Sequence, residues 1–360
     1  MWQKPNSLIK QHKGRVSALL RIPTQQNRIP SMSDIPRFWH SRNPISLLLL
    51  PFAALFAAIS TARRMLYRCG ILKSWRAPVP VLIVGNLTVG GSGKTPLVQA
   101  LTRGLQTRDI NVGIISRGYG GSAQTATDVA TCPDAAVVGD EPLLLWQTTG
   151  APVVIARKRA TAAQKLLHDY PATHLLIADD GLQHYALARD AEIVVIAADL
   201  GLGNGFLLPA GPLRETSTRL RRADIVLSGN PARYPHPHSY PLHYASDGVH
   251  PLDGGERRPL TALAAPLYAL TAIARPERFF NSLRAQGAML KACRSLPDHA
   301  ALPAAEADFA VNGSLIISGK DAVKTAAWPE TLKQRTYIAD YRAELPPELL
   351  PLLLHRLGLA

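Results

Sequence analysis

Cysteine is scarce in this chain, which has three cysteines among its 360 residues. Cys69, Cys132 and Cys293 are far apart in the sequence, and they form no C-x-x-C pair. This spacing excludes a disulfide framework and the common structural zinc sites. We therefore expect a reducing, cytoplasmic environment.

Acidic residues are nearly missing from the first 76 positions. These positions hold thirteen Lys or Arg against one acid, Asp34, so they carry almost all of the formal net charge of +14. The remainder of the chain is close to neutral and does not require a basic groove, so we expect no nucleic-acid partner. A basic segment of this kind suits the anionic surface of a membrane.

Charge is absent from residues 43–62, which include the apolar run ISLLLLPFAALFAAI between Arg42 and Arg63. Twenty helical residues cover about 30 Å, the thickness of a hydrocarbon core. Pro51 would kink such a helix in its middle. The basic flanks favour a membrane-associated helix over a buried core helix, whereas spanning and interfacial attachment both stay open.

The predicted domain organisation follows these changes in composition. Residues 1–42 form a basic, poorly ordered leader that is too long for the n-region of a signal peptide, and Met32 is a second possible start. Residues 43–76 form the membrane-associated helix and its basic flank. A core follows at residues 77–229, a linker or hairpin rich in Pro, His, Tyr and Gly at residues 230–259, and a smaller lobe at residues 260–360.

The core shows short β-branched runs that alternate with helical stretches. Strands are predicted at residues 79–84, 112–115, 153–156, 175–178, 193–197 and 225–227. Their apolarity is continuous, which is typical of strands buried on both faces of a parallel sheet. We expect an α/β fold with a doubly wound parallel sheet. The smaller α/β lobe is predicted to hold strands at 267–270 and 315–318 and helices at 276–286 and 347–357.

The run VPVLIVGNLTVGGSGKTP predicts a strand, a glycine-rich phosphate-binding loop and a helix start. Backbone N–H groups of such a loop converge on phosphate oxygens, Lys94 would neutralise phosphate charge, and the Thr95 hydroxyl would bind Mg²⁺. The usual motif has glycine at position 88, but this chain has threonine there, so Gly90 and Gly91 must make the turn. The predicted loop comprises Thr88, Val89, Gly90, Gly91, Ser92, Gly93, Lys94 and Thr95.

Two carboxylates, Asp179 and Asp180, follow the buried strand in HLLIADDGLQHY. Adjacent carboxylates are costly to bury without a cation, and the magnesium ion of a phosphate-binding loop would supply one. The alternative is a strand-end turn in which an aspartate caps the next helix. Beside the glycine-rich loop we favour metal binding.

Two further pairs of adjacent ionisable residues are candidates for proton transfer. Asp140 and Glu141 open an apolar helical run, where they would either cap the helix or act as a general base. Asp298 precedes His299 and would orient and polarise its imidazole.

Two loops with cationic residues follow strand-like runs, where α/β folds gather their binding residues. SRGYGG contains Arg117 and Tyr119, and LPAGPLRE contains Arg214 and Glu215. Solvated surface is the alternative interpretation of both.

In this order, GNLTVGGSGKTP, SRGYGG, GDEPLLL, DDGLQHYALARD, GNGFLLPAGPLRE, RPERFF and DHA resemble the tetraacyldisaccharide 4'-kinase family. The resemblance extends from about residue 34 to the last residue. It implies a P-loop NTPase-type core and transfer of phosphate from ATP, with Mg²⁺, to the 4'-hydroxyl of a tetraacylated disaccharide 1-phosphate, which yields lipid IVA. An acylated lipid substrate and the lipids of the inner membrane are the implied partners, at the cytoplasmic face of that membrane.

The resemblance also implies roles for individual residues. Asp140 and His299 would deprotonate the sugar hydroxyl, and Lys94 would hold phosphate. The implied metal side comprises Thr95, Asp179, Asp180 and Glu141. The implied substrate residues are Arg117, Tyr119, Gln183, His184, Arg214 and Glu215. The family pattern Thr-Glu-Lys-Asp after the late strand is replaced here by residues 318–321, which therefore stay outside the predicted catalytic set.

A membrane-associated P-loop nucleotide switch without lipid kinase activity is the alternative function. Switches of the deviant Walker A type carry a signature lysine before the paired glycines, where this chain has Val89. This difference favours the kinase.

Overall fold

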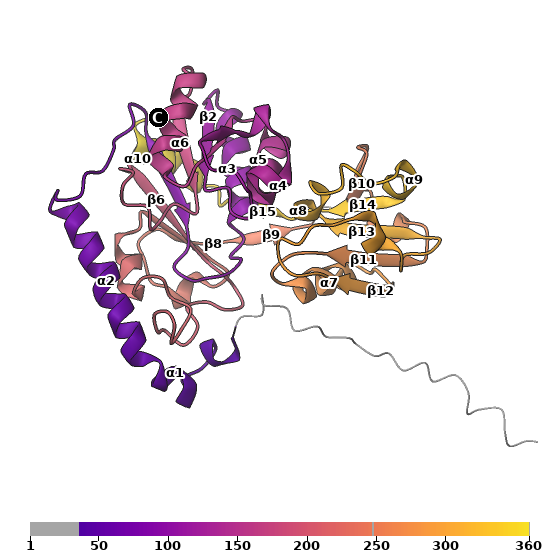
Figure 1. The fold of residues 1–360 in the computed structure, drawn as a ribbon, viewed down its shortest axis with the longest axis horizontal. Helices are drawn as coiled ribbons and strands as arrows, with labels where there is room; N and C mark the ends of the chain where they lie inside the picture. The colour runs from indigo at the N-terminus through magenta and orange to yellow at the C-terminus, as the bar shows by residue number, and fades with distance from the viewer. Residues whose placement is uncertain (1–35, 247, 360) are drawn as a thin grey trace, which may run out of the picture. The chain divides into compact units, whose positions relative to one another are not determined.

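Two β-sheets with helices against them organise the part of the chain that the computed structural model describes, residues 36–246 and 248–359. The predicted leader falls largely outside these residues. The described residues belong to one compact unit, so contacts between the two sheets are part of its architecture. Figure 1 shows the smaller sheet beside the larger one, with β9 and β15 between them.

The apolar N-terminal stretch forms two helices, α1 (Pro44–Leu48) and α2 (Leu50–Arg68). Asn43 caps α1 through reciprocal hydrogen bonds with Ser46. Pro51 lies in the first turn of α2, where its missing N–H has no intrahelical partner to lose. The predicted kink in the middle of one helix is therefore wrong. Among the described helices, none is both long and apolar enough to cross a membrane.

The larger sheet has eight strands in the order β3-β4-β2-β5-β1-β6-β7-β8. All neighbours are parallel except β3 and β4. The strands are β1 (Val81–Gly85), β2 (Val112–Ser116), β3 (Thr127–Asp128), β4 (Val153–Ile155), β5 (Leu175–Asp179), β6 (Ala191–Ile196), β7 (Ile225–Ser228) and β8 (Ser239–Pro241). The six strands predicted for the core are confirmed.

Helices cover both faces of the larger sheet. Leu82 and Val84 of β1 join one apolar cluster with α3 (Lys94–Gln106), α5 (Asp140–Thr149) and α10 (Leu349–Leu357). The alternate residues of β1, Val81 and Ile83, join the other cluster with α6 (Arg159–Asp169). This arrangement confirms the doubly wound fold.

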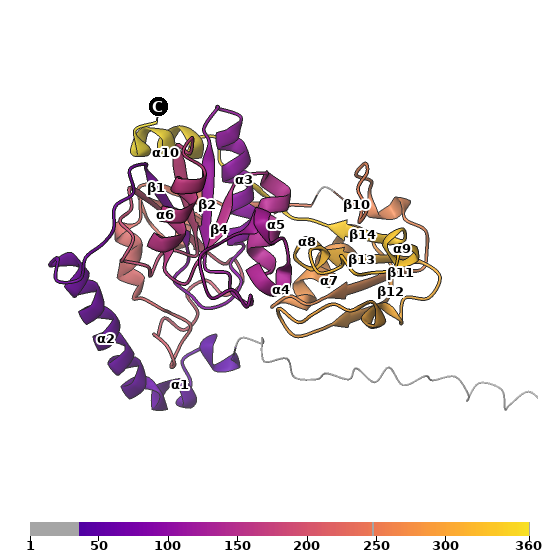
Figure 2. The ribbon, with the colours of Figure 1, turned by 45° about the horizontal axis from the view of Figure 1, so that its top comes forward.

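The last helix, α10, differs from the expectation that placed it in the smaller lobe. Leu350 and Leu353 of α10 lie in the apolar cluster that contains Leu101 of α3. Figure 2 shows α10, in yellow, next to the larger sheet. Its amphipathic pattern predicted a helix but did not indicate which sheet it would cover.

The smaller sheet has the order β10-β14-β13-β11-β12, and only β10 runs antiparallel to its neighbour. Its strands are β10 (Val249–Pro251), β11 (Leu267–Thr271), β12 (Leu290–Ser295), β13 (Ser314–Ser318) and β14 (Thr336–Ala339). Phe279 and Leu283 of α7 (Pro276–Ala285) pack on one face, and Trp328 and Leu332 pack on the other. This sheet confirms the predicted smaller α/β lobe.

The stretch predicted as a linker or hairpin contributes one short strand to each of three sheets. β8 extends the larger sheet and β10 begins the smaller one. Between them, β9 (His243–Ala245) pairs antiparallel with β15 (Arg342–Glu344), where the chain returns from the smaller lobe. The lobes are thus joined by a two-stranded connection.

Short helices complete the described structure. They are α4 (Ala135–Val138), α8 (Gly319–Ala322), α9 (Glu330–Lys333) and the 3₁₀ helices Arg37–Trp39, Val129–Thr131, Ser217–Arg222, Pro231–Arg233, Leu260–Ala262 and Ala304–Ala307.

Candidate functional site

The glycine-rich loop joins β1 to α3 at the carboxyl edge of the larger sheet. Gly90 and Gly93 have φ angles of 103° and 83°, in the left-handed region that favours glycine. A Cβ atom on Gly93 would also collide with the hydroxyl of Tyr244 on β9. Because the loop ends at the N-terminus of a three-turn helix, its backbone amides and the helix dipole form an anion-binding site.

The threonine at position 88 is explained by local pairing. Thr88 is buried and pairs antiparallel with Leu213, and the N–H of Val89 donates to the carbonyl of Pro212 at 2.9 Å. The backbone at position 88 is therefore extended and does not require glycine. The loop is held by a neighbouring segment as well as by its own glycines.

Lys94 is the cation of this loop. Its side chain is 13% exposed, and its Nζ lies 3.4 Å from Oδ1 of Asp180. Nζ also donates to Oδ1 of Asn86 at 3.1 Å, while Nδ2 of Asn86 donates to the carbonyl of Thr88 at 2.7 Å. The ammonium is thus held between the loop and the end of β5, as the phosphate-binding role requires.

The two predicted metal carboxylates lie in different environments. Asp179 is buried, its Oδ1 has no hydrogen-bond partner within the described structure, and burial raises its pKa above the ordinary value. Asp180 pairs with Lys94 and with Nη1 of Arg214 at 3.1 Å. Burial opposes its ionisation, but these two cations hold its pKa far below the ordinary range.

Two cavities adjoin at this edge of the sheet. The smaller, about 250 Å³, lies beside Gly93 and Thr95 and has an apolar wall that includes Leu144, Ile273 and Phe279. The larger is about 770 Å³ and extends from the Asp179–Asp180 pair to α2. Both cavities are lined by Gly91, Glu141, Ala274 and Lys320.

The predicted pair of Asp140 and His299 meets across the two lobes. Nδ1 of His299 lies 3.1 Å from Oδ2 of Asp140. Nε2 of His299 lies 3.2 Å from Nζ of Lys320, which can only donate. In this arrangement Nε2 accepts from the ammonium and the Nδ1–H donates to Asp140, while Oδ2 of Asp298 lies 3.6 Å from Nε2. Burial opposes ionisation of Asp140, yet this hydrogen bond and the charge of Lys324 lower its pKa.

The predicted substrate residues all line the larger cavity. They are Arg117, Tyr119, Gln183, His184, Arg214 and Glu215. The Tyr119 ring lies 5.1 Å from that of His299 in an edge-on contact. Burial and the charge of Arg159 lower the pKa of His184 to about 4, so its imidazole is neutral at pH 7.

Glu215 connects this cavity to α2. Its carboxylate accepts from the hydroxyl of Tyr185 at 2.6 Å and lies 3.6 Å from Nη1 of Arg64 on α2 and from Nε of Arg219. Nε2 of Gln183 donates to it at 3.2 Å. Since Glu215 already has these partners, it supports the cavity wall.

Sequence reasoning missed three buried cations. Arg159 opens α6 after β4, is 3% exposed, and donates to the carbonyl of Asp179 at 2.8 Å. Lys320 and Lys324 follow β13 and reach Glu141 and Asp140 at 3.4 and 3.0 Å. All three follow the carboxyl end of a strand, which is the signal that located the other predicted site residues. An isolated basic residue in a polar stretch, however, has the sequence pattern of a solvent-exposed surface.

A family model of the tetraacyldisaccharide-1-P 4'-kinases (LpxK) matches residues 45–358. The chain belongs to this family. It is 43% identical over 327 residues to the tetraacyldisaccharide 4'-kinase of Dichelobacter nodosus, which covers 90% of this chain and 97% of that protein. It is equally identical over 335 residues to that of Chromobacterium violaceum, with 91% and 98% covered. Family membership identifies the chain as a kinase.

A solved structure of a family member has the same fold. The crystal structure of LpxK from Aquifex aeolicus in complex with ATP superimposes with a TM-score of 0.72 at 28% identity. It covers 87% of this chain and 99% of the Aquifex chain. The kinase fold therefore includes both lobes described above.

Proposed function

We propose that the chain transfers the γ-phosphoryl group of ATP to the 4'-hydroxyl of a tetraacyldisaccharide 1-phosphate, forming lipid IVA in lipid A biosynthesis. This proposal rests on the two adjoining cavities. One lies beside the phosphate-binding loop and the other reaches α2, and Glu141 and Lys320 line both. A nucleotide in the first and a lipid in the second would place phosphate and hydroxyl together.

The glycine-rich loop and Lys94 would hold the phosphates of ATP. Phosphoryl transfer depends mainly on positioning and on neutralising charge, which backbone amides and a buried ammonium provide. The apolar wall of the smaller cavity, which includes Leu144, Ile273 and Phe279, suits a nucleotide base.

The residues at the end of β5 fit a magnesium ion. The buried Oδ1 of Asp179 has no hydrogen-bond partner among the described residues, and a buried carboxylate oxygen of this kind is satisfied by a cation. No cluster of three His, Cys, Asp or Glu suited to a metal occurs within residues 36–246 and 248–359. Mg²⁺ bound with ATP needs few protein ligands, because phosphate oxygens and water complete its shell.

We propose that the metal side comprises Thr95, Asp179, Asp180 and Glu141, of which only one or two would bind the ion directly. When bound, Mg²⁺ would neutralise charge on the transferring phosphate.

Asp140 would accept the proton of the sugar hydroxyl. His299 and Lys324 keep its carboxylate ionised. As the hydroxyl oxygen forms a bond to the γ-phosphorus, the bond from that phosphorus to the β–γ bridging oxygen breaks and ADP leaves. His299 holds the carboxylate through its Nδ1–H and stabilises it throughout the transfer.

The larger cavity offers both charge and apolar surface to a lipid substrate. Arg117 and Arg214 suit phosphate and sugar oxygens, and Phe56 and Ile59 of α2, together with Leu208, suit acyl chains. Tyr119, Gln183, His184 and Glu215 complete the proposed substrate wall.

One side of α2 presents an apolar surface to the surroundings. Leu48, just before α2, and Phe52, Leu55 and Ile59 within it are 60–78% exposed and recur every three or four residues. Basic residues on and beyond the helix, including Arg63 and Lys73, would meet anionic headgroups. We infer interfacial attachment to inner-membrane lipids at the cytoplasmic face of a bacterial inner membrane.

We further propose that residues 77–229 act as the nucleotide lobe and that most of residues 260–360 form the lobe that completes the site. Residues 1–35 of the leader, and with them the choice between Met1 and Met32, lie outside the described residues.

Transfer of labelled γ-phosphate from ATP to tetraacyldisaccharide 1-phosphate in detergent micelles tests the proposed function. We expect a magnesium-dependent product from the wild type and far less from Asp140→Ala or Lys94→Ala. ATP hydrolysis without lipid product would instead favour the nucleotide-switch alternative.

A further inference from the structure

Lys324 of the smaller lobe contacts the proposed base of the larger lobe. It lies two residues beyond α8, its side chain is 6% exposed, and its Nζ is 3.0 Å from Oδ2 of Asp140. Nζ also lies 3.1 Å from the carbonyl oxygen of Ala300 and 3.4 Å from Oδ1 of Asp321. The contacts to Ala300 and Asp321 are hydrogen bonds and the contact to Asp140 is an ion pair, so protein acceptors surround this ammonium.

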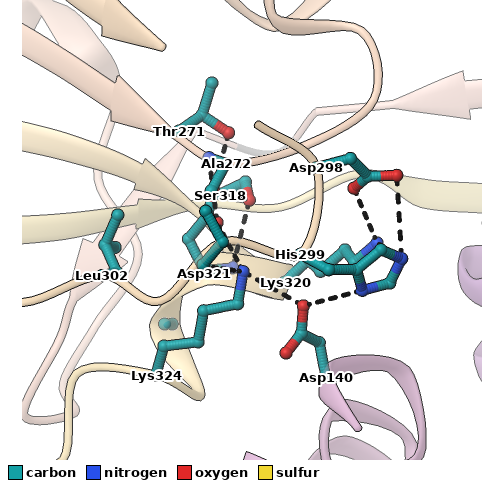
Figure 3. A network of polar contacts seen from close by, with 12 residues as sticks. Asp140, Thr271, Ala272, Asp298, His299, Leu302, Ser318, Lys320, Asp321 and Lys324 are labelled. Atoms are coloured by element: carbon teal, nitrogen blue, oxygen red, sulfur yellow. Dashed lines mark hydrogen bonds and ion pairs between the residues drawn. The ribbon is translucent and has the colours of Figure 1, made fainter. Parts of the chain in front are cut away.

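Asp321 anchors Lys324 within the smaller lobe. Its side chain is fully buried, and its Oδ2 accepts from the hydroxyls of Thr271 and Ser318, each at 2.6 Å. Its Oδ1 accepts from the N–H of Ala272 at 3.1 Å. Figure 3 shows this network leading from the ends of β11 and β13 through Asp321 and Lys324 to Asp140. A carboxylate with this many donors is a rigid support for the ammonium.

The contacts on Asp140 distinguish its two oxygens. His299 and Lys324 both meet Oδ2, and their approach is visible in Figure 3. Oδ1 forms no hydrogen bond within residues 36–246 and 248–359. The two partners from the smaller lobe therefore hold the carboxylate by one oxygen, in a buried position beside His299, which lines the larger cavity.

Lys320 differs from Lys324 in what it faces. Lys320 lines both cavities, whereas Lys324 lines neither and its ammonium lies among protein acceptors. Asp140 has one charged neighbour on its own helix, Glu141. Three further groups approach it from the smaller lobe: His299, Lys320 and Lys324. Asp298 pairs with His299 and Lys320, and Asp321 pairs with Lys324. Lys324 is the ammonium in direct contact.

We propose that Lys324, supported by Asp321, is a positioning residue that orients the Asp140 carboxylate for proton transfer. This inference rests on the proposed function, because it assigns to Lys324 a role in the same phosphoryl transfer.

The test compares Lys324→Met and Lys324→Gln with the matched control Lys333→Met, in both the wild-type and the Asp140→Asn backgrounds. Lys333 pairs with Glu330 on α9. In the wild-type background we expect each Lys324 variant to lower kcat about 100-fold and to change KM for ATP less than threefold. In the Asp140→Asn background the same changes should alter the residual rate less than threefold, because the group that Lys324 positions is gone.

A purely structural ion pair predicts a different result. If Lys324 only stabilises the smaller lobe through Ala300 and Asp321, the losses should be equal in both backgrounds, and that result would overturn the inference. Glutamine retains an N–H donor on a side chain one bond shorter than that of lysine. It provides a second variant if methionine prevents folding, and thermal unfolding checks both proteins. Wild type without lipid product would overturn the proposed function, whereas wild-type product with unaffected Lys324 variants would overturn this inference alone.

Discussion

The two lobes present the same kind of sheet edge to the site, but they contribute different charged groups to the contact between them. In each, parallel strands end at the site: β1 and β5 in the larger sheet, β11 and β13 in the smaller. The larger edge contributes a phosphate-binding loop and four carboxylates, Asp140, Glu141, Asp179 and Asp180. The smaller edge contributes His299 and the two ammonium groups of Lys320 and Lys324.

This difference indicates how the lobes are held together. Lys324 meets Asp140 at 3.0 Å and Lys320 meets Glu141 at 3.4 Å, so each interlobe ion pair takes its acid from the larger lobe and its cation from the smaller. The larger lobe thus carries the groups that would bind metal and phosphate, and the smaller lobe carries those that set the state of the proposed base. Catalysis would require both edges to meet.

The largest expected effect is on the larger edge, at Asp179. Asp179→Asn should lower kcat for lipid phosphorylation about 1000-fold and raise the magnesium concentration needed for half-maximal rate, because a neutral amide is a poorer ligand than a carboxylate. Titration of activity with MgCl₂ measures both. Asp169→Asn, which removes a surface carboxylate, is the control. An unchanged magnesium requirement would contradict the assignment.

On the smaller edge, His299→Ala should reduce kcat about 100-fold and leave KM for ATP nearly unchanged, because the imidazole acts on Asp140 and not on the nucleotide. Steady-state kinetics in micelles measure the two constants, with His168→Ala at an exposed site as the control. Turnover equal to wild type would remove His299 from the mechanism.

The proposed membrane attachment depends on α2 and not on the two sheet edges at the site. The double variant Phe52→Glu, Leu55→Glu should lower binding to anionic vesicles about tenfold or more, because both side chains are more than half exposed on the apolar side of α2. Activity in detergent micelles should change little. Flotation with vesicles measures binding. The control is Ala54→Glu, because residue 54 lies roughly 100° from Leu55 and roughly 160° from Phe52 around the helix. Equal loss in both variants would contradict a directional apolar face.

The smallest effect concerns stability of the smaller lobe and its dependence on pH. Nε2 of His250 lies 3.0 Å from Oδ2 of Asp340, and this hydrogen bond raises the pKa of His250. The pair therefore stabilises the fold fully below the unfolded pKa of about 6.5, and this stabilisation is lost as pH rises through the higher folded pKa. Burial opposes ionisation of Asp340, but its hydrogen bond to His250 and the charges of His250 and Arg257 together lower its pKa, so its contribution is lost only in acid.

His250→Gln should accordingly destabilise the protein by about 0.5 kcal/mol at pH 6 and by less at pH 9. Thermal unfolding at the two pH values measures the difference, with His168→Gln as the control. A larger loss of stability at pH 9 than at pH 6 would contradict this pH dependence.

Much of the larger lobe was predictable because its strands are continuous apolar runs, as in Leu175–Asp179. The connection between the lobes was not, since β8, β9 and β10 have three residues each, and sequences such as SYP and HYA carry no periodicity. Motifs with fixed spacing located Lys94, and the family resemblance located the Asp140–His299 pair. Lys320 and Asp321 were left outside the predicted catalytic set, because residues 318–321 depart from the family pattern. Their surroundings arise only where α8, which follows β13, packs against α5.

The position of α10 has a consequence for synthesis of the protein on the ribosome. The smaller lobe, residues 249–341, is made in one continuous piece, whereas the larger lobe needs Leu349, Leu353 and Leu357 to complete the apolar layer over α3. A nascent chain would therefore expose part of that layer while the later lobe is already able to fold. The lobe whose synthesis begins first is therefore completed last, and we expect a chain shortened before residue 349 to lose stability in the lobe that carries the glycine-rich loop.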